Sequence, residues 1–529
     1  MHHPSSNGPS PLFVPLHPSP RLVAQMTGLS LRQSELEVRQ QNQLKGMLRR
    51  IRAARHRGSG RGPRTPRGGR AAKSLIAIPT LVLPESQVHS REGSEGWHDT
   101  DSLGRPSAGG SDTEDEDDDD RAMLRRMDLT MEIGDSPSEC ELRARVAQLF
   151  NSVFGPAPPI EAARVTVDRL SGAMTNCVYM VAVAGRHIGR GGREMPAKYL
   201  LRVYGTGVDE FLSRENELYW LRQLSALGFG PRLYGIFGNG RLEEFLESTT
   251  LQKEDLRHPS TSKHIARRMS ELHALVSYYR PFPGAATAAN APAAIANGGP
   301  NLWINIDAWL LLVHKKWTRI SAVCSGNPSC AAILASWADL ETAVGRLRAH
   351  IEGGKSPVVF AHDDLQYGNI LRLRDTGELV VVDFEYAGYN YRGFDIANHF
   401  CEWMADYHGP IPHLLDEARY PTAAQRECFL RTYVKAKAFL DANMKAEAGL
   451  VESDAVHAIR LRAVNLNEDR LSAEVAALER EVAPFVAASH LHWGIWGLLQ
   501  ACSSEIDFDY VGYATQRLSI FLRQVANLA

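Results

Sequence analysis

The feature that most constrains the fold is the stretch from Val358 to Tyr407, VVFAHDDLQYGNILRLRDTGELVVVDFEYAGYNYRGFDIANHFCEWMADY. An apolar run at its start ends in His362-Asp363-Asp364, and Asn369 follows five residues after Asp364. A short apolar run bounded by polar residues is typical of a buried strand. The stretch therefore predicts a strand whose end carries a cluster of oxygen-bearing side chains.

The next segment predicts a β-hairpin. Two apolar runs, Ile370–Arg374 and Leu379–Val382, are separated by four residues that include a glycine. A tight turn would place Ile370 opposite Asp383, which follows the second run. Asn369 and Asp383 would then lie side by side at the open end of the hairpin.

Asp364, Asn369 and Asp383 together would form an oxygen-rich site, which suits Mg²⁺ carrying nucleotide phosphates. The spacing His-x-Asp-x4-Asn followed by an apolar-Asp-Phe triplet is the one that kinase-type phosphotransferases use. In that scheme Asp364 accepts the proton of the attacking hydroxyl, and Asn369 and Asp383 hold the metal. The alternative is a hairpin whose polar ends are merely solvated, but the joint pattern favours a functional site.

The run DFEYAGYNYRGFDIANHFCEW, which begins at Asp383, resembles the choline/ethanolamine kinase family closely. The resemblance implies an α+β, two-lobed protein-kinase-like fold, with a β-rich N-lobe built on an antiparallel sheet and a mostly helical C-lobe. It implies ATP and Mg²⁺ as cofactors and phosphorylation of choline to phosphocholine, the first step of the CDP-choline route to phosphatidylcholine. Arg392 and Trp403 make the run more similar to the choline branch than to the ethanolamine branch. Gln366 joins Asp364 and Asn369 as a catalytic residue by the same resemblance, whereas Asp363 stands where the family usually has asparagine.

Charge is segregated along the chain, although 59 basic and 61 acidic residues nearly balance. Residues 45–73 contain no acid, and residues 111–120 are almost all acidic. Residues 1–138 are rich in Ser, Pro, Gly, Arg and Asp, so we expect a disordered extension, similar to that of fungal members of the family. The basic tract could contact nucleic acid or anionic lipid, but a solvated charge run is the favoured explanation, and no nucleic-acid partner is expected.

The remaining composition favours an enzyme of the cytoplasm. The seven cysteines form no CxxC pair, no apolar run spans a bilayer uninterrupted, and the N-terminus lacks the pattern of a signal peptide. We expect no integral membrane association and leave a homodimer open. Folding should begin near Cys140, with a helix over 141–154. We place the N-lobe at 139–248 and the helical C-lobe at 249–529, where helices are expected over 302–320 and 331–351.

Nucleotide-binding residues are expected in the N-lobe. Two strand-like runs flank a small-residue turn that resembles the family's nucleotide loop, made of Ser171, Gly172, Ala173, Met174, Thr175 and Asn176. Arg202 points away from its strand neighbours, where a protein kinase has its phosphate-binding lysine. The following helix supplies Glu217, or Glu215, as the partner of Arg202. Glu244 falls where the family contacts the adenine side.

An acceptor with an ammonium group needs aromatic faces and nearby carboxylates. Trp493 and Trp496 lie one helical turn apart and share a face. Such a pair is often core packing, but here the set is similar to the family's choline pocket. The expected acceptor residues are Glu385, Tyr386, Glu402, Tyr407, Trp493, Trp496 and Tyr513.

Three other functions remain as alternatives. An ethanolamine kinase, or a dual choline/ethanolamine kinase, would use the same machinery. A protein or aminoglycoside kinase is disfavoured by the tryptophan pair and the central run. A catalytically dead scaffold is disfavoured because every catalytic position is filled. Asp395 is expected to tether either the catalytic loop or Arg392.

Overall fold

The structure is a computed structural model, and it describes residues 128–129, 133, 138–170, 176–204, 214–227, 229–275, 299–447, 467–504 and 506–528. The disorder predicted for the extension therefore lies almost entirely outside the described residues. So do the basic tract, the acidic tract and residues 171–175 of the expected nucleotide loop.

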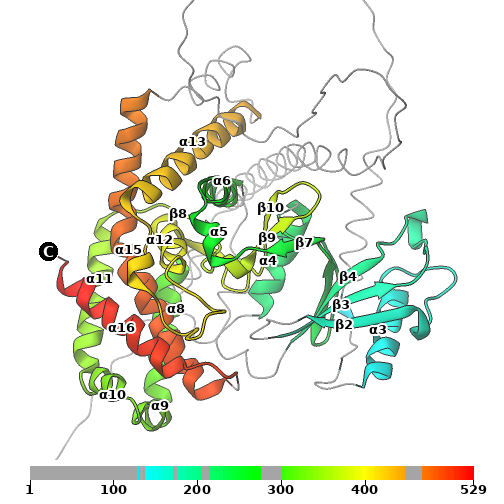
Figure 1. Ribbon diagram of the computed structural model, residues 1–529, viewed down its shortest axis with the longest axis horizontal. Helices are drawn as coiled ribbons and strands as arrows, with labels where there is room; N and C mark the ends of the chain where they lie inside the picture. Colours follow the sequence, from blue (N-terminus) through cyan, green and yellow to red (C-terminus); the bar gives the residue numbers. More distant parts are fainter. Residues whose placement is uncertain are drawn as a thin grey trace, which may run out of the picture. The chain divides into compact units, whose positions relative to one another are not determined.

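The N-terminal part is built on one six-stranded sheet with the spatial order β1-β5-β6-β4-β3-β2. β1 pairs with β5 in parallel, and all other neighbours are antiparallel. In Figure 1, β2, β3 and β4 lie together beside α3. The strands are β1 (Asp128–Leu129), β2 (Val165–Leu170), β3 (Asn176–Val183), β4 (Lys198–Tyr204), β5 (Leu233–Phe237) and β6 (Gly240–Glu244). The helices of this part are α3 (Glu139–Val153), α4 (Arg214–Leu227) and the short 3₁₀ helices η1 (Ala162–Arg164) and η2 (Arg190–Gly192).

The helix α3 covers the apolar face of this sheet. It begins after Ser138, whose hydroxyl accepts a hydrogen bond from the N–H of Glu141 at 3.3 Å. Its apolar residues recur at helical spacing and pack against Val165, Val181 and Leu201 of the strands. These helix residues are Leu142, Val146, Leu149 and Phe150. The helix predicted over 141–154 is confirmed.

The folded part begins earlier than predicted. Ile133 is buried, and its backbone exchanges hydrogen bonds of 2.8 and 2.6 Å with the side chain of Asn239. β1 adds an edge strand to the sheet. The expected start near Cys140 was therefore too late, because two paired residues and one anchor leave no periodic apolar pattern in the sequence.

The C-terminal part is mostly helical and shares one large apolar core. α15 runs through it and packs against α8, α12 and α16 (Figure 1). The helices of the C-terminal part are α5 (Lys253–Arg257), α6 (Pro259–Leu275), α8 (Asn301–Lys315), α9 (Trp317–Cys324), α10 (Pro328–Ala335), α11 (Trp337–Gly353), α12 (Arg392–Glu402), α13 (Ala423–Glu447), α15 (Glu468–Ser503) and α16 (Tyr510–Ala526), with the 3₁₀ helices η6 (Tyr367–Asn369) and η7 (Glu417–Arg419).

Two helices expected as continuous are each divided. The helix predicted over 302–320 is interrupted at Lys316, and the one predicted over 331–351 is interrupted at Ser336. Both residues leave the helical region, with ψ values of 13° and 31°. The breaks let α8 to α11 turn around α15 and α16, so that their apolar faces stay in the common core.

Two small sheets carry the catalytic stretch. One has the order β10-β9-β7, and the other pairs β11 with β8. These strands are β7 (Ser248–Thr250), β8 (Val358–Ala361), β9 (Ile370–Leu373), β10 (Leu379–Val381) and β11 (Gly388–Tyr391).

The β9–β10 hairpin is confirmed, but its predicted register is wrong by two residues. Leu379 pairs with Arg372, and Val381 rather than Asp383 pairs with Ile370. The cause is the turn: Gly377, at a φ of 70°, donates its N–H to the carbonyl of Leu373 at 2.9 Å. The turn thus takes up residues that were assigned to the strand.

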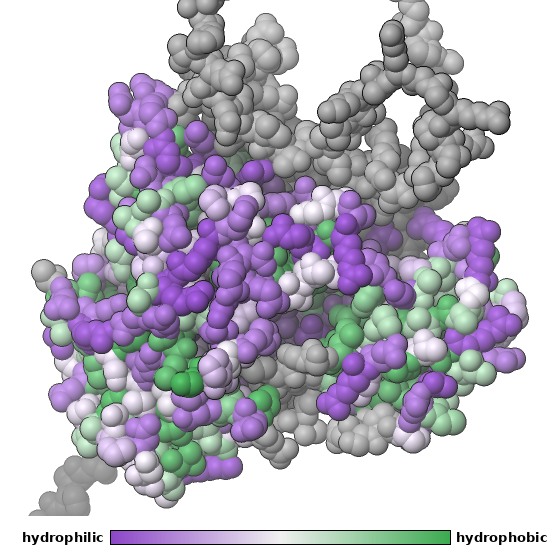
Figure 2. Space-filling view, in the orientation of Figure 1, coloured by the Kyte–Doolittle hydropathy of each residue, from purple (hydrophilic) through white to green (hydrophobic). Residues whose placement is uncertain are grey.

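Hydrophilic residues cover most of the described surface on the face drawn in Figure 2. No helix among the described residues is long and apolar enough to cross a membrane.

Candidate active site

The backbone of the loop after β8 is anchored by a buried carboxylate. Asp395 of α12 accepts hydrogen bonds from the N–H groups of His362 (3.1 Å) and Asp363 (2.8 Å). His273 of α6 lies 2.8 Å from the same carboxylate and completes the anchor. Of its two expected partners, Asp395 therefore tethers the catalytic loop. Asp363 adopts a φ of 64°, which turns the chain sharply before Asp364.

Asp364 and Asn369 lie in contact. The Nδ2 group of Asn369 donates to the Oδ2 atom of Asp364 at 2.8 Å and to its carbonyl oxygen at 2.9 Å. The amide oxygen of Asn369 is thereby directed away from Asp364. Gln366 stabilises the turn between them, since its Oε1 atom accepts a hydrogen bond from the N–H of Gly368 at 2.9 Å. The spacing of five residues thus brings the two predicted groups together.

Asp383 lies at the end of β10, beside the strand end that carries Asn369. The N–H of Val382 donates to the carbonyl of Asn369 at 3.0 Å, and Asp383 then leaves the strand with a φ of 66°. The Nη1 group of Arg202, from β4, lies 3.3 Å from its Oδ1 atom. The predicted neighbourhood of Asn369 and Asp383 is reached despite the shifted register.

Arg202 belongs to a buried group of charges on the N-terminal sheet. Burial opposes its charge, but the carboxylates of Asp383, Glu243 and Glu217 together outweigh that effect and raise the pKa of Arg202. Glu217 of α4 forms an ion pair with Arg241 of β6, and Arg241 also pairs with Glu243. Glu217 therefore reaches Arg202 electrostatically, within a group that includes a second arginine that the sequence analysis missed.

Several carboxylates lie close together at the catalytic loop, and the positive charges among the described residues do not offset their mutual repulsion. Burial, followed by the charges of Glu402, Glu385 and Asp383, raises the pKa of Asp364 well above its usual range. Burial and the charge of Asp383 raise the pKa of Glu385 to about 8. The Oε2 atom of Glu385 is buried with no hydrogen-bond partner among the described residues. Such a site gains electrostatically from binding a cation.

This donor set fits Mg²⁺, which prefers carboxylate and amide oxygens. Asn369 turns its amide oxygen away from Asp364, and Asp383 lies on the adjacent strand end. Within the described part of the chain, no three His, Cys, Asp or Glu side chains are grouped to hold a metal. The site predicted here depends instead on one amide and one carboxylate, and it stays a prediction.

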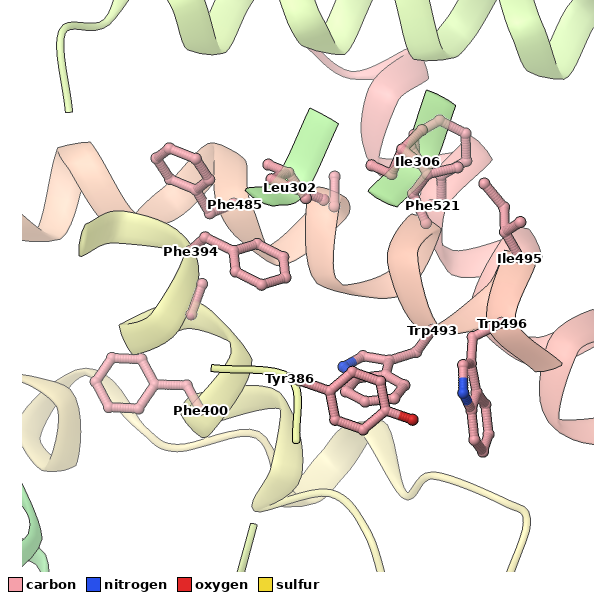
Figure 3. Packing of buried hydrophobic residues seen from close by; sticks show 14 of the residues in the cluster. Leu302, Ile306, Tyr386, Phe394, Phe400, Phe485, Trp493, Ile495, Trp496 and Phe521 are labelled. Carbon is pink, nitrogen blue, oxygen red and sulfur yellow. The ribbon is translucent and has the colours of Figure 1, made fainter. Parts of the chain in front are cut away.

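Aromatic rings form the other side of the site. The ring of Tyr386 lies 5.1 Å from that of Trp493, which lies 5.4 Å from that of Trp496. Trp496 is in turn 6.1 Å from Tyr513 of α16. Figure 3 shows Tyr386, Trp493 and Trp496 grouped at the edge of the apolar core. The pKa of Tyr386 is raised by burial and by the charges of Glu385 and Asp364, so the rings adjoin the catalytic loop.

Glu402 is the carboxylate of this aromatic side, and both its oxygens are already bonded. The hydroxyl of Tyr407 donates to its Oε2 atom at 2.6 Å, and Arg517 donates to its Oε1 atom at 3.0 Å. Arg517 is fully buried, with its guanidinium 5.1 Å from the ring centre of Tyr513. The sequence analysis missed Arg517, although it falls on the apolar face of α16, one turn after Tyr513.

Asn398 joins the two sides of the site. Its Oδ1 atom accepts from the indole N–H of Trp493 at 2.8 Å, and its Nδ2 group donates to the carbonyl of Asp363 at 2.9 Å. The aromatic helix α15 is thereby fixed to the catalytic loop. The sequence analysis missed this residue too; its signal is an amide one helical turn from both Asp395 and Glu402 on the buried side of α12.

The other predicted nucleotide residues are only partly described. Ser171, Gly172, Ala173, Met174 and Thr175 lie outside the described residues. Asn176 begins β3, but its side chain, like that of Glu215, is not described. Glu244 ends β6, and its Oε2 atom accepts a hydrogen bond from the N–H of Arg232 at 3.1 Å.

Comparisons with known proteins agree with this geometry. A family model described as choline/ethanolamine kinase matches residues 167–522. A probable choline kinase 2 of Arabidopsis thaliana is 34% identical over 358 residues, which are 68% of this chain and 85% of that protein. A choline/ethanolamine kinase of Homo sapiens is 32% identical over 377 residues, which are 70% of this chain and 82% of that protein.

Solved structures support the same fold. An ethanolamine kinase of Plasmodium vivax matches with a TM-score of 0.52 at 25% identity, covering 68% of this chain and 82% of that one. A choline kinase of Cryptosporidium parvum matches with a TM-score of 0.51 at 21% identity, covering 72% of this chain and 95% of that one. The predicted α+β, protein-kinase-like fold is confirmed.

Proposed function

The chain belongs to the choline/ethanolamine kinase family, and we propose that it transfers the γ-phosphoryl group of ATP to the hydroxyl of choline. Kinase activity on choline or ethanolamine is what the family membership supports, and choline as the preferred acceptor is the further step. The product, phosphocholine, would enter the CDP-choline route to phosphatidylcholine.

The position of Asp364 carries the proposal. Its carboxylate accepts a hydrogen bond from Asn369. Asn369, Asp383 and Arg202 lie where the phosphates of ATP would bind, and we call this the phosphoryl side. On the aromatic side, the charge of Glu402 contributes to the raised pKa of Asp364. A group between the two sides can accept the proton of an acceptor hydroxyl while that oxygen attacks phosphorus. Its raised pKa suits this role, because a carboxylate with a raised pKa is a stronger proton acceptor than an ordinary aspartate.

The phosphoryl side needs only to position and neutralise charge. Arg202 would hold phosphate oxygens, while Asn369 and Asp383 would hold Mg²⁺. When bound, Mg²⁺ neutralises charge on the phosphates. The turn from Ser171 to Asn176 would cover the phosphates with backbone N–H groups.

The aromatic side supports choline over ethanolamine. A quaternary ammonium donates no hydrogen bond and binds chiefly to ring faces, which Tyr386, Trp493 and Trp496 supply. Glu402 already accepts a hydrogen bond on each oxygen, from Arg517 and from Tyr407, so a primary ammonium would have to share this carboxylate with two donors of the protein.

One observation favours the second candidate, an ethanolamine or dual kinase. The Oε2 atom of Glu385 is buried without a hydrogen-bond partner in the described part of the chain, and a primary ammonium could donate to it.

A coupled assay of ADP release on the full chain distinguishes these functions. With saturating MgATP, we expect kcat/KM for choline to exceed that for ethanolamine by at least tenfold. Equal or reversed values would overturn the choline preference. Turnover of neither alcohol would overturn the proposed function itself.

A further inference from the structure

A cavity lies away from the catalytic loop, among α12, α13, α15, α16 and η7. Its volume is about 430 Å³, within the range of small-molecule sites. Its inner wall is apolar and buried, formed by Phe400, Met404, Leu430, Val482 and Ala487. None of the rings of the acceptor side lines it.

One buried polar group in the wall lacks a partner. His490 of α15 lines the cavity, is only 1% exposed, and its Nδ1 atom has no hydrogen-bond partner among the described residues. A buried polar atom left unpaired costs free energy, which a hydrogen-bonding group bound in the cavity would recover once the imidazole turned its Nδ1 edge toward it. Burial and the charges of Arg517 and Arg523 hold the pKa of His490 well below its usual range, so the imidazole is neutral.

The charged side chains around the cavity are already paired with one another. Arg426 binds Glu479 at 2.8 Å and lies over the ring of Tyr420. Glu417 forms an ion pair with Arg523 of α16. A charged ligand would have to compete with these pairs, whereas an uncharged one leaves them intact.

We propose that this cavity is a binding site for an uncharged amphipathic small molecule, with an apolar body against Phe400, Met404 and Leu430 and one hydroxyl or amide bonded to His490. A hydroxyl suits either tautomer of the imidazole, because it both donates and accepts. The site does not depend on the identity of the phosphorylated alcohol.

Benzyl alcohol and toluene form a matched pair of probes, since they differ only by the hydroxyl. We would measure their dissociation constants on the full chain by ligand-observed NMR titration, with saturating choline present to block the acceptor site. We expect benzyl alcohol to bind at least tenfold more tightly than toluene, because only it bonds to His490. In His490→Phe this difference should disappear.

Two further variants test the location without disturbing the core. Ala483 lines the cavity but is exposed, so Ala483→Phe should block the entrance and remove binding of both probes. Ala477→Phe, on another exposed face of α15, should bind both as the unmodified chain does. The proposal is overturned if neither probe binds, if both bind equally, if raising the choline concentration displaces benzyl alcohol, or if Ala483→Phe binds normally.

Discussion

The two sides of the site handle buried charge in opposite ways. On the aromatic side, Glu402 is fully bonded by Arg517 and Tyr407, both contributed by the protein itself. On the phosphoryl side, Asp364 and Glu385 remain under-compensated, and their pKa values are raised. Of the carboxylates of Asp364, Asp383 and Glu385, Arg202 pairs with that of Asp383, at 3.3 Å, and it also lies 3.9 Å from Glu243 of the N-terminal sheet.

This difference indicates on which side the protein itself compensates the carboxylate charges and on which side bound ligands would have to do so. A raised carboxylate pKa means that the fold destabilises the charged form, because it removes the group from water without supplying enough positive charge. The phosphoryl side therefore gains most from a metal ion, whereas on our proposal the aromatic side offers its ring faces to the cation of the acceptor. Variants on the two sides should differ in which kinetic constant they change.

The largest effect is expected from Asp364→Ala. Removing the proton acceptor should lower kcat by about a thousandfold, within the usual range for a general base. The fold should persist, because Asp364 is only half-buried and the substitution removes a carboxylate crowded by Glu402, Glu385 and Asp383. Steady-state kinetics and thermal denaturation would check this, with Asp375→Ala in the exposed hairpin turn as the matched control. Turnover within tenfold of the unmodified enzyme would contradict the role.

Asp383→Asn should change the metal requirement. We expect the Mg²⁺ concentration for half-maximal activity to rise by ten- to a hundredfold, a range typical of weakened metal sites. Titration of activity with Mg²⁺ at saturating ATP measures it. Glu402→Gln, on the aromatic side, serves as the comparison and should leave the Mg²⁺ requirement unchanged. An unchanged requirement in Asp383→Asn would remove the metal from this strand end.

Trp496→Ala should act on the other substrate. Loss of one ring face from a desolvated cation site costs up to about 2 kcal/mol, so KM for choline should rise roughly tenfold or more. KM for ATP should stay within about twofold. Trp317→Ala, a half-buried tryptophan on α9, controls for the loss of an indole from the same core. If Trp496→Ala raised both KM values equally, the ring would be structural only.

The sequence predicted the residues of the phosphoryl side better than the hairpin register and the ion pairs that position them. Asp364 and Asn369 are close in the chain, so their spacing alone brings them together. The hairpin register was wrong because one glycine in a left-handed conformation lengthened the turn. The spacing of residues did not predict the role of Arg241, because Arg241 pairs with Glu243 on its own strand and with Glu217 on α4.

The aromatic side was predictable as a set of residues but not as a network. Helical spacing gave the ring pair of Trp493 and Trp496. It did not give Asn398, which connects Trp493 to the catalytic loop across about a hundred residues of sequence. Arg517 was detectable as one charge on an apolar helix face, but its ion pair with Glu402, itself a predicted acceptor residue, was not.

The smallest effect on turnover is expected from Asp363→Asn, a variant that separates charge burial from catalysis. Burial and the neighbouring Asp395 raise the pKa of Asp363 well above its usual range, although Asn390 donates to it at 3.0 Å. Above a pH of about 4 the unfolded chain loses this proton while the folded chain keeps it, so the free energy of unfolding falls by up to about 1.4 kcal/mol per pH unit. In Asp363→Asn that contribution should disappear. Urea denaturation at pH 5, 6 and 7 measures both slopes, with Asp375→Asn as the control. Parallel slopes for Asp363→Asn and the unmodified chain would mean that Asp363 is ionised in the fold. The loop anchored by Asp395 would then tolerate a second buried negative charge, as the phosphoryl side does.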